Sequence, residues 1–210
     1  MPPARGSGSS RSDGKVGVHQ EHGSGRGCPV SGLNKGAGGL SKGLGKVQVS
    51  LRWDPSPMGL PDNDLDLIAA TYTAEEPYGK PAYLVHFDSR SPDGTILLNR
   101  DSRTGMGLGS DEVMTLELDR LSPTYARVVV GVAIQQGGGR KTFGDVANTG
   151  VRVTEGYTEL AADDFAAVAG ATAATVVEFV RTGQGAWEYR PVVRGFDADP
   201  AAFATVMGSA

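Results

Sequence analysis

The stretch from Asp101 to Glu112 has the residue types and spacing of a cation site. It reads Asp-Ser-Arg-Thr-Gly-Met-Gly-Leu-Gly-Ser-Asp-Glu, so carboxylates stand at both ends, with glycine at Gly105, Gly107 and Gly109 between them. Glycine accepts either sign of φ, which lets these positions turn backbone carbonyl oxygens inward. Carboxylate and carbonyl oxygens together suit calcium, which takes about six to eight oxygen ligands in flexible geometry.

The stretch does not follow two familiar calcium patterns. An EF-hand loop needs acids at positions 3 and 5 and glycine at position 6, where this chain has Arg103, Gly105 and Met106. The calcium nonapeptide of β-helices fits residues 107–113, but it occurs once and a β-helix needs it repeated. A glycine-rich connection capped by solvated acids is therefore the alternative to a calcium site.

A second group of acids precedes an apolar segment at Asp62-Asn-Asp-Leu-Asp66. In an extended chain alternate side chains share a face, so Asp64 and Asp66 are expected on the same side. Two carboxylates on one face repel each other. A bound cation would remove this repulsion more completely than water does.

Composition and charge exclude several classes of protein. Residues 1–52 carry eight basic and two acidic side chains, so the remainder carries twelve basic and twenty-two acidic, a net of −10. This acidic remainder argues against a nucleic-acid groove, which needs clustered positive charge. Cys28 is the only cysteine, which excludes an internal disulfide and a cysteine-rich zinc site. No apolar run approaches the roughly 20 residues of a transmembrane segment, and no secretory signal is recognisable, so we expect a cytoplasmic protein.

The elements that must position these acids are short strands. Residues 1–32 are rich in Gly, Ser and Arg and predict a disordered tail, with one domain over residues 33–210. Alternating or β-branched segments separated by turns predict an all-β fold, a two-sheet antiparallel β-sandwich. Pro200–Met207 predicts a short C-terminal helix. Strands are expected at 46–53, 62–69, 82–88, 96–99, 113–118, 125–134 and 159–165, and as a hairpin built from 171–180 and 187–193.

No catalytic motif is recognisable in the chain. There is no Gly-x-Ser-x-Gly elbow, phosphate loop or dinucleotide fingerprint, and only three histidines occur. We therefore expect a protein without enzymatic activity.

A set of motifs occurs along roughly residues 33–208 in a particular order and spacing: Asp64-Leu-Asp66, Ser91-Pro-Asp-Gly94, Asp101-Ser-Arg-Thr-Gly105, Gly107, Gly109, Asp111-Glu112, Phe143-Gly144, Asn148, Trp187 and Gly195-Phe196. Taken together, these motifs resemble the TerD family, the bacterial tellurium-resistance and stress-response family.

The resemblance implies a β-sandwich that binds calcium through acidic loops, acts in the cytoplasm or peripherally at the inner face of the membrane, and works with other stress-response proteins. Carried onto this sequence, the carboxylate ligands it implies are Asp64, Asp66, Asp88, Asp101, Asp111 and Glu112. Backbone carbonyls of Arg103, Gly105, Gly107 and Gly109 would supplement them.

The chain departs from the family pattern in its loop. Met106, Leu108 and Ser110 stand where the family usually carries acids. Because calcium affinity depends on the charge of the ligand set, we expect one surviving site that binds more weakly than the family norm. The two apolar residues also support an alternative function, a metal-independent adaptor that binds another protein through the same sandwich.

Overall fold

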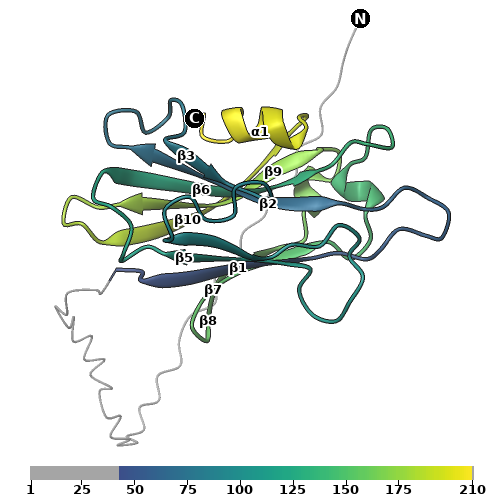
Figure 1. The fold of residues 1–210 in the computed structure, drawn as a ribbon, viewed down its shortest axis with the longest axis horizontal. Helices are drawn as coiled ribbons and strands as arrows, with labels where there is room; N and C mark the ends of the chain where they lie inside the picture. The colour runs from purple at the N-terminus through teal and green to yellow at the C-terminus, as the bar shows by residue number, and fades with distance from the viewer. Residues whose placement is uncertain (1–42, 210) are drawn as a thin grey trace, which may run out of the picture. The chain divides into compact units, whose positions relative to one another are not determined.

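The computed structural model describes residues 43–209, and it contains two antiparallel five-stranded sheets and one α-helix (Figure 1). The first sheet has the order β4-β5-β1-β7-β8 and the second β10-β9-β6-β2-β3. The strands are β1 (Lys46–Arg52), β2 (Leu65–Thr73), β3 (Tyr83–Val85), β4 (Ile96–Arg100), β5 (Glu112–Glu117), β6 (Tyr125–Ile134), β7 (Gly150–Glu155), β8 (Thr158–Asp163), β9 (Ala173–Arg181) and β10 (Trp187–Phe196). The predicted two-sheet β-sandwich is confirmed. The tail predicted for residues 1–32 lies outside the described part of the chain.

In the first sheet, β1 buries one face only. Along β1, Val47, Val49 and Leu51 are fully buried, whereas Lys46 and Gln48 are exposed. This is the alternation that a strand shows when one face packs on the core and the other meets water. The sequence pattern alone therefore predicts this strand correctly.

The second sheet is covered on both faces. Its inner face packs against the first sheet in the main core, and its outer face packs against the helix α1 (Pro200–Val206). The helix begins at the cap Asp199, whose side chain accepts the Ala202 N–H, and it buries Phe203 against the sheet. Double coverage explains why β2 and β6 read as nearly continuous apolar runs.

A buried ion pair fixes the helix side of the second sheet. The Arg127 guanidinium on β6 donates to Glu178 on β9, at 2.7 Å from Nε to Oε2, and also to the carbonyl oxygens of Pro77 and Gly208. Arg127 therefore ties the loop after β2 and the end of the chain to the middle of the sheet.

The strand predicted at Ala82–Asp88 is wrong in its second half. Only Tyr83–Val85 is a strand, because His86 and Ser89 bond to each other through their backbones and reverse the chain. The strand predicted from Asp62 begins at Leu65 instead. The strand predicted at 171–180 is β9, and Thr182 and Ala186 close the predicted hairpin.

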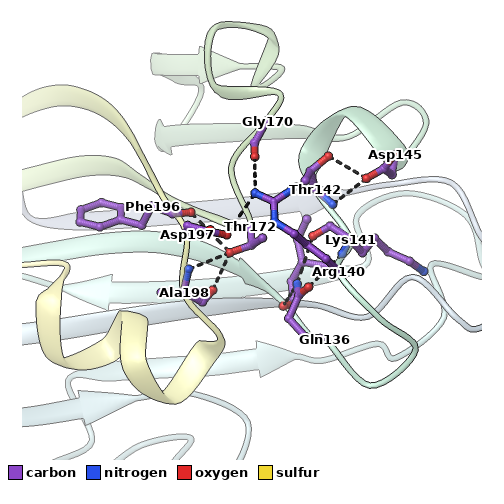
Figure 2. A network of polar contacts seen from close by, with 11 residues as sticks. Gln136, Arg140, Lys141, Thr142, Asp145, Gly170, Thr172, Phe196, Asp197 and Ala198 are labelled. Carbon is purple, nitrogen blue, oxygen red and sulfur yellow. Dashed lines mark hydrogen bonds and ion pairs between the residues drawn. The ribbon is translucent and has the colours of Figure 1, made fainter.

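Three loops meet at one end of the sandwich, on the right in Figure 1. They are residues 53–64, 101–111 and 135–149, and strand pairing places them together because Leu51 lies opposite Glu112 and Leu65 opposite Ile134. Figure 2 shows how the third loop is held: Arg140 bonds to the Gly170 carbonyl and to Asp197. Among residues 43–209, no helix is long and apolar enough to cross a membrane.

Candidate metal centre

Three carboxylates meet where these loops join the two sheets. Asp66 lies near the start of β2, Asp101 follows β4, and Glu112 begins β5. One oxygen from each lies within 4.8 Å of the others. A cation with ligands at about 2.3–2.6 Å would hold oxygens at such separations, so the group could bind a metal ion.

Glu112 is the most deeply buried member of this carboxylate group and has one unused oxygen. Its side chain is fully buried, and Oε2 accepts the backbone N–H of Leu67. This N–H is not used in strand pairing, because β3 pairs only with residues 69–71 of β2 and the start of β2 has no neighbouring strand on that side. Oε1 has no hydrogen-bond partner. A buried carboxylate oxygen without a partner is costly, and a cation would satisfy it.

Burial dominates the electrostatics of the group. It raises the pKa of Glu112 to about 10, and the charges of Asp66 and Asp101 act in the same direction. Burial also raises the pKa of Asp66 to about 7, with the charge of Asp64 as the next cause. Without a cation, the group retains protons at neutral pH because several negative charges cannot share a poorly solvated space.

Asp64 and Arg103 lie at the rim of the group. Asp64 is half-buried, and burial raises its pKa, while the positive charge of Arg103 acts against that rise and the charge of Asp101 adds to it. The Arg103 side chain therefore serves as a counter-charge to these acids. Coordination by the Arg103 carbonyl stays a prediction.

Two predicted ligands lie outside the carboxylate group. Asp111 Oδ2 accepts the Trp53 N–H at 3.0 Å, and the Asp111 N–H donates to Leu51, so this residue fastens the loop to the end of β1. Asp88 is exposed in the turn between His86 and Ser89. The chain reverses before Asp88 can reach the other acids.

The three glycines of the loop adopt the backbone that only glycine tolerates well. Gly105, Gly107 and Gly109 have φ of 66°, 147° and 89°. A Cβ on Gly105 would also lie 2.5 Å from the Trp53 indole nitrogen, so this glycine lets the loop pack directly on β1's end. The predicted conformational freedom is used, while coordination by their carbonyls stays a prediction.

One residue at the site has no sequence signal. Gln135 directly follows β6, and its side-chain amide donates to Asp66 Oδ2 at 2.7 Å. Its backbone N–H donates to the Asp64 carbonyl at 2.8 Å. A single glutamine after an apolar strand carries no recognisable pattern, so only strand pairing reveals this contact.

Known proteins resemble this chain over nearly all of the described domain. The TerD domain model matches residues 32–206. Tellurium resistance protein TerD of Alcaligenes sp. is 29% identical over 172 residues, which are 78% of this chain and 90% of that protein. General stress protein 16U of Bacillus subtilis (strain 168) is 26% identical over 171 residues, 79% of this chain and 89% of that protein.

A solved structure is more similar still. The crystal structure of a homologue of telluride resistance protein (TerD) from Streptomyces coelicolor A3(2) is 64% identical, with a TM-score of 0.79. It covers 80% of this chain and 99% of that one. The resemblance read from the sequence is therefore confirmed, and the chain belongs to the TerD domain family.

Proposed function

We propose that this protein is a cytoplasmic, non-enzymatic stress-response protein of the tellurium-resistance type that binds one calcium ion between Asp66, Asp101 and Glu112. The observation that carries the proposal is the fully buried Glu112, which has an unpartnered oxygen within 4.8 Å of the two other carboxylates. Relatives named for tellurium resistance and general stress support the physiological role.

The ligand chemistry favours calcium. The group offers only carboxylate oxygens, without histidine or cysteine, which disfavours zinc and copper. Magnesium demands a tighter octahedron, whereas calcium accepts the irregular set that two strands and a loop supply. Asp64 and loop carbonyls are the nearest source of further ligands. Because Met106, Leu108 and Ser110 contribute no carboxylate, affinity should be lower than in relatives with acids at those positions.

A bound cation would act here through structure. It would offset two of the three negative charges that Asp66, Asp101 and Glu112 carry when ionised, and it would join β2 to the loop that leads into β5. The proposal includes no catalysis, because the sequence carries no recognisable catalytic motif.

Calcium titration by calorimetry together with thermal melting tests this proposal. Calcium at a hundredfold excess over Kd should stabilise the fold by about 2.7 kcal/mol and raise the melting temperature by about 5–10 °C. The Glu112→Gln variant should lose both the heat and the shift, whereas Asp88→Asn, at an exposed acid outside the group, should keep both. Absence of heat and shift at millimolar calcium would exclude the cation site.

A metal-independent adaptor is the second candidate function. The specific observation is that the side chains of Met106 and Leu108 are 68% and 96% exposed. Other members of the family are expected to carry acids at these loop positions. An adaptor would bind its protein partner equally well with calcium and with a chelator. Loss of partner binding upon chelation would exclude it.

A further inference from the structure

The outer face of the first sheet holds a polar cavity of about 1070 Å³. It is lined by the ends of β1 and β8, the start of β7, the last residues of the 101–111 loop and the loop before β7 (Figure 1). Leu51 lies opposite Glu112, and both are fully buried on the core side of the sheet. Because side chains alternate along a strand, Ser50 and Arg52 point to the other face. The cavity is therefore separate from the candidate metal centre.

Two arginines form the positive part of this cavity. Arg52 lies opposite Gly150, and Arg152 lies opposite Ser50, so the two arginines are diagonal neighbours on one face of the β1–β7 pair. Diagonal neighbours come within reach of each other when their side chains are long. The other two positions of this square are a serine and a glycine, which are too small to fill the space between the arginines.

Neither arginine has a strong partner among residues 43–209. Arg52 is exposed and makes no hydrogen bond or ion pair with them. Arg152 has one ion pair, at 3.7 Å from Nε to Glu159 Oε2, and both side chains are more than half exposed. An exposed pair of this kind contributes little free energy. Arg127, by contrast, donates to a carboxylate and to two carbonyl oxygens. Two guanidinium groups are thus available to a ligand in the cavity.

Two serines and two aspartates complete the polar lining. Ser50 and Ser110 are half-buried, and their hydroxyls make no hydrogen bond within the described part of the chain. Asp163 and Asp164 also line the cavity, but their carboxylates accept backbone N–H groups of the turn that follows β8, at 2.6 and 3.0 Å. The arginines and the serine hydroxyls are therefore the donors that a ligand would meet, and the aspartates lie on the wall formed by the end of β8.

This set of donors fits a phosphate group. Guanidinium groups bind phosphate and carboxylate through paired N–H donors. A phosphate monoester carries nearly two negative charges and three acceptor oxygens at neutral pH, which matches two arginines and two hydroxyls better than a single carboxylate does. The cavity is also much larger than a phosphate group, so an organic part of the ligand would have room beside the aspartates.

We propose that this cavity binds the phosphate group of a small molecule, with Arg52 and Arg152 as its charge partners and Ser50 and Ser110 as hydroxyl donors. The site goes beyond the proposed calcium function and does not depend on it, because it lies on the opposite face of the first sheet. It gives the domain a small-molecule ligand in addition to the proposed ion.

NMR titration of the isotopically labelled full chain in metal-free buffer tests this inference. The probes are glycerol phosphate, inorganic phosphate and, as a singly charged control, acetate. Both phosphate compounds should shift the amide signals of residues 50–52, 110 and 150–152 in a saturable way, and acetate at the same concentration should not. Tighter binding of glycerol phosphate would assign the ligand to the phosphate esters, whereas equal binding would assign it to free phosphate. Either result supports the phosphate site.

Variants separate the charge of the cavity from its shape. Arg52→Gln and Arg152→Gln should each weaken phosphate binding at least about tenfold, because each removes a charge-assisted contact. Gly150→Val keeps both arginines but fills the space between them, so it should also abolish binding. Its added Cβ would have only the Asp163 carbonyl oxygen nearby, at 3.9 Å, and valine suits a strand, so the fold should persist. Lys46→Gln is the matched control: Lys46 is exposed on the same face of β1 but outside the cavity, and this variant should bind phosphate like the parent.

The outcomes keep the phosphate site apart from the calcium proposal. Arg52→Gln should bind calcium like the parent, since Arg52 is not one of the proposed ligands. Absence of saturable shifts at millimolar phosphate would overturn the phosphate site and leave the calcium proposal in place. Equal weakening by Lys46→Gln, or binding that survives both arginine variants, would show that the anion is held elsewhere, for example by the basic residues before the domain, and would also overturn it.

Discussion

Calcium binding by this protein should release protons, so its affinity should rise with pH near neutrality. Carboxylates bind calcium in their ionised form. Burial raises the pKa of Glu112 to about 10 and that of Asp66 to about 7. At pH 7 the metal-free protein therefore holds one proton on Glu112 and about half a proton on Asp66, and binding should release about one to two protons.

The expected change in affinity follows from the same two carboxyls. The slope of the logarithm of the association constant against pH equals the number of protons released. The association constant should therefore increase about 20-fold between pH 7 and pH 8, where both carboxyls contribute, and about tenfold between pH 8 and pH 9, where only Glu112 does. An exposed set of acids would show almost no change over this range, because exposed carboxyls are already ionised.

Calorimetry measures the released protons directly. Titrations at one pH in buffers with different ionisation enthalpies give a line of observed heat against buffer enthalpy, and its slope is the number of protons exchanged. Asp88→Asn should give the same slope as the parent, because Asp88 lies outside the carboxylate group. A heat that does not depend on the buffer, together with an affinity that stays constant from pH 7 to pH 9, would refute the reasoning from burial.

Three further predictions concern stability. In chelator, the raised pKa of Asp66 means that the folded state binds more protons than the unfolded state from about pH 4 to pH 7, so this residue lowers the free energy of unfolding as pH rises, by up to roughly 4 kcal/mol. Asp66→Asn should therefore stabilise the chelated protein more at pH 8 than at pH 5 in urea denaturation. Equal effects at both pH values would contradict this. Gly105→Ala should destabilise the fold by about 2–4 kcal/mol, because φ of this residue is positive and the added Cβ would meet the Trp53 indole. Gly109→Ala is the matched variant: its φ is also positive, but the added Cβ would meet no other atom, so it should cost only about 1 kcal/mol. A similar cost at both positions would rule out the steric contribution. Arg127→Ala should cost about 3–5 kcal/mol in the same assay, because it leaves the carboxylate of the buried ion pair without its positive partner, and a loss below about 1 kcal/mol would show that water replaces the guanidinium.

Local patterns predict much of this fold because they reflect local causes. The alternation in residues 46–53 reports that one face of β1 is buried, and the turn residues 182–185 report a hairpin. Such signals require only neighbours along the chain. The error at 82–88 has the same origin: the segment is apolar enough for a strand, but the backbone contact of His86 with Ser89 ends it after Val85.

The candidate site could be predicted only in part. The glycine positions in the 101–112 loop and the acids at its ends are visible in sequence, and so is the pair at Asp64 and Asp66. The distances between these residues in the folded protein are not visible in the sequence. Asp88 and Asp111 have the same chemistry as Asp101, yet one lies in an exposed turn and the other bonds to Trp53.

The amino-acid sequence by itself determined that this protein is a β-sandwich with a glycine-rich acidic loop, because side-chain periodicity and glycine's backbone freedom are properties of short segments. Only the tertiary structure decided which acids meet. Asp66, Asp101 and Glu112 come from separate segments, and they converge because β3 leaves the start of β2 unpaired and open to Glu112. Burial at that position raises the pKa values of Glu112 and Asp66 and leaves one Glu112 oxygen available to a cation. The extent of burial cannot be read from the type of a residue.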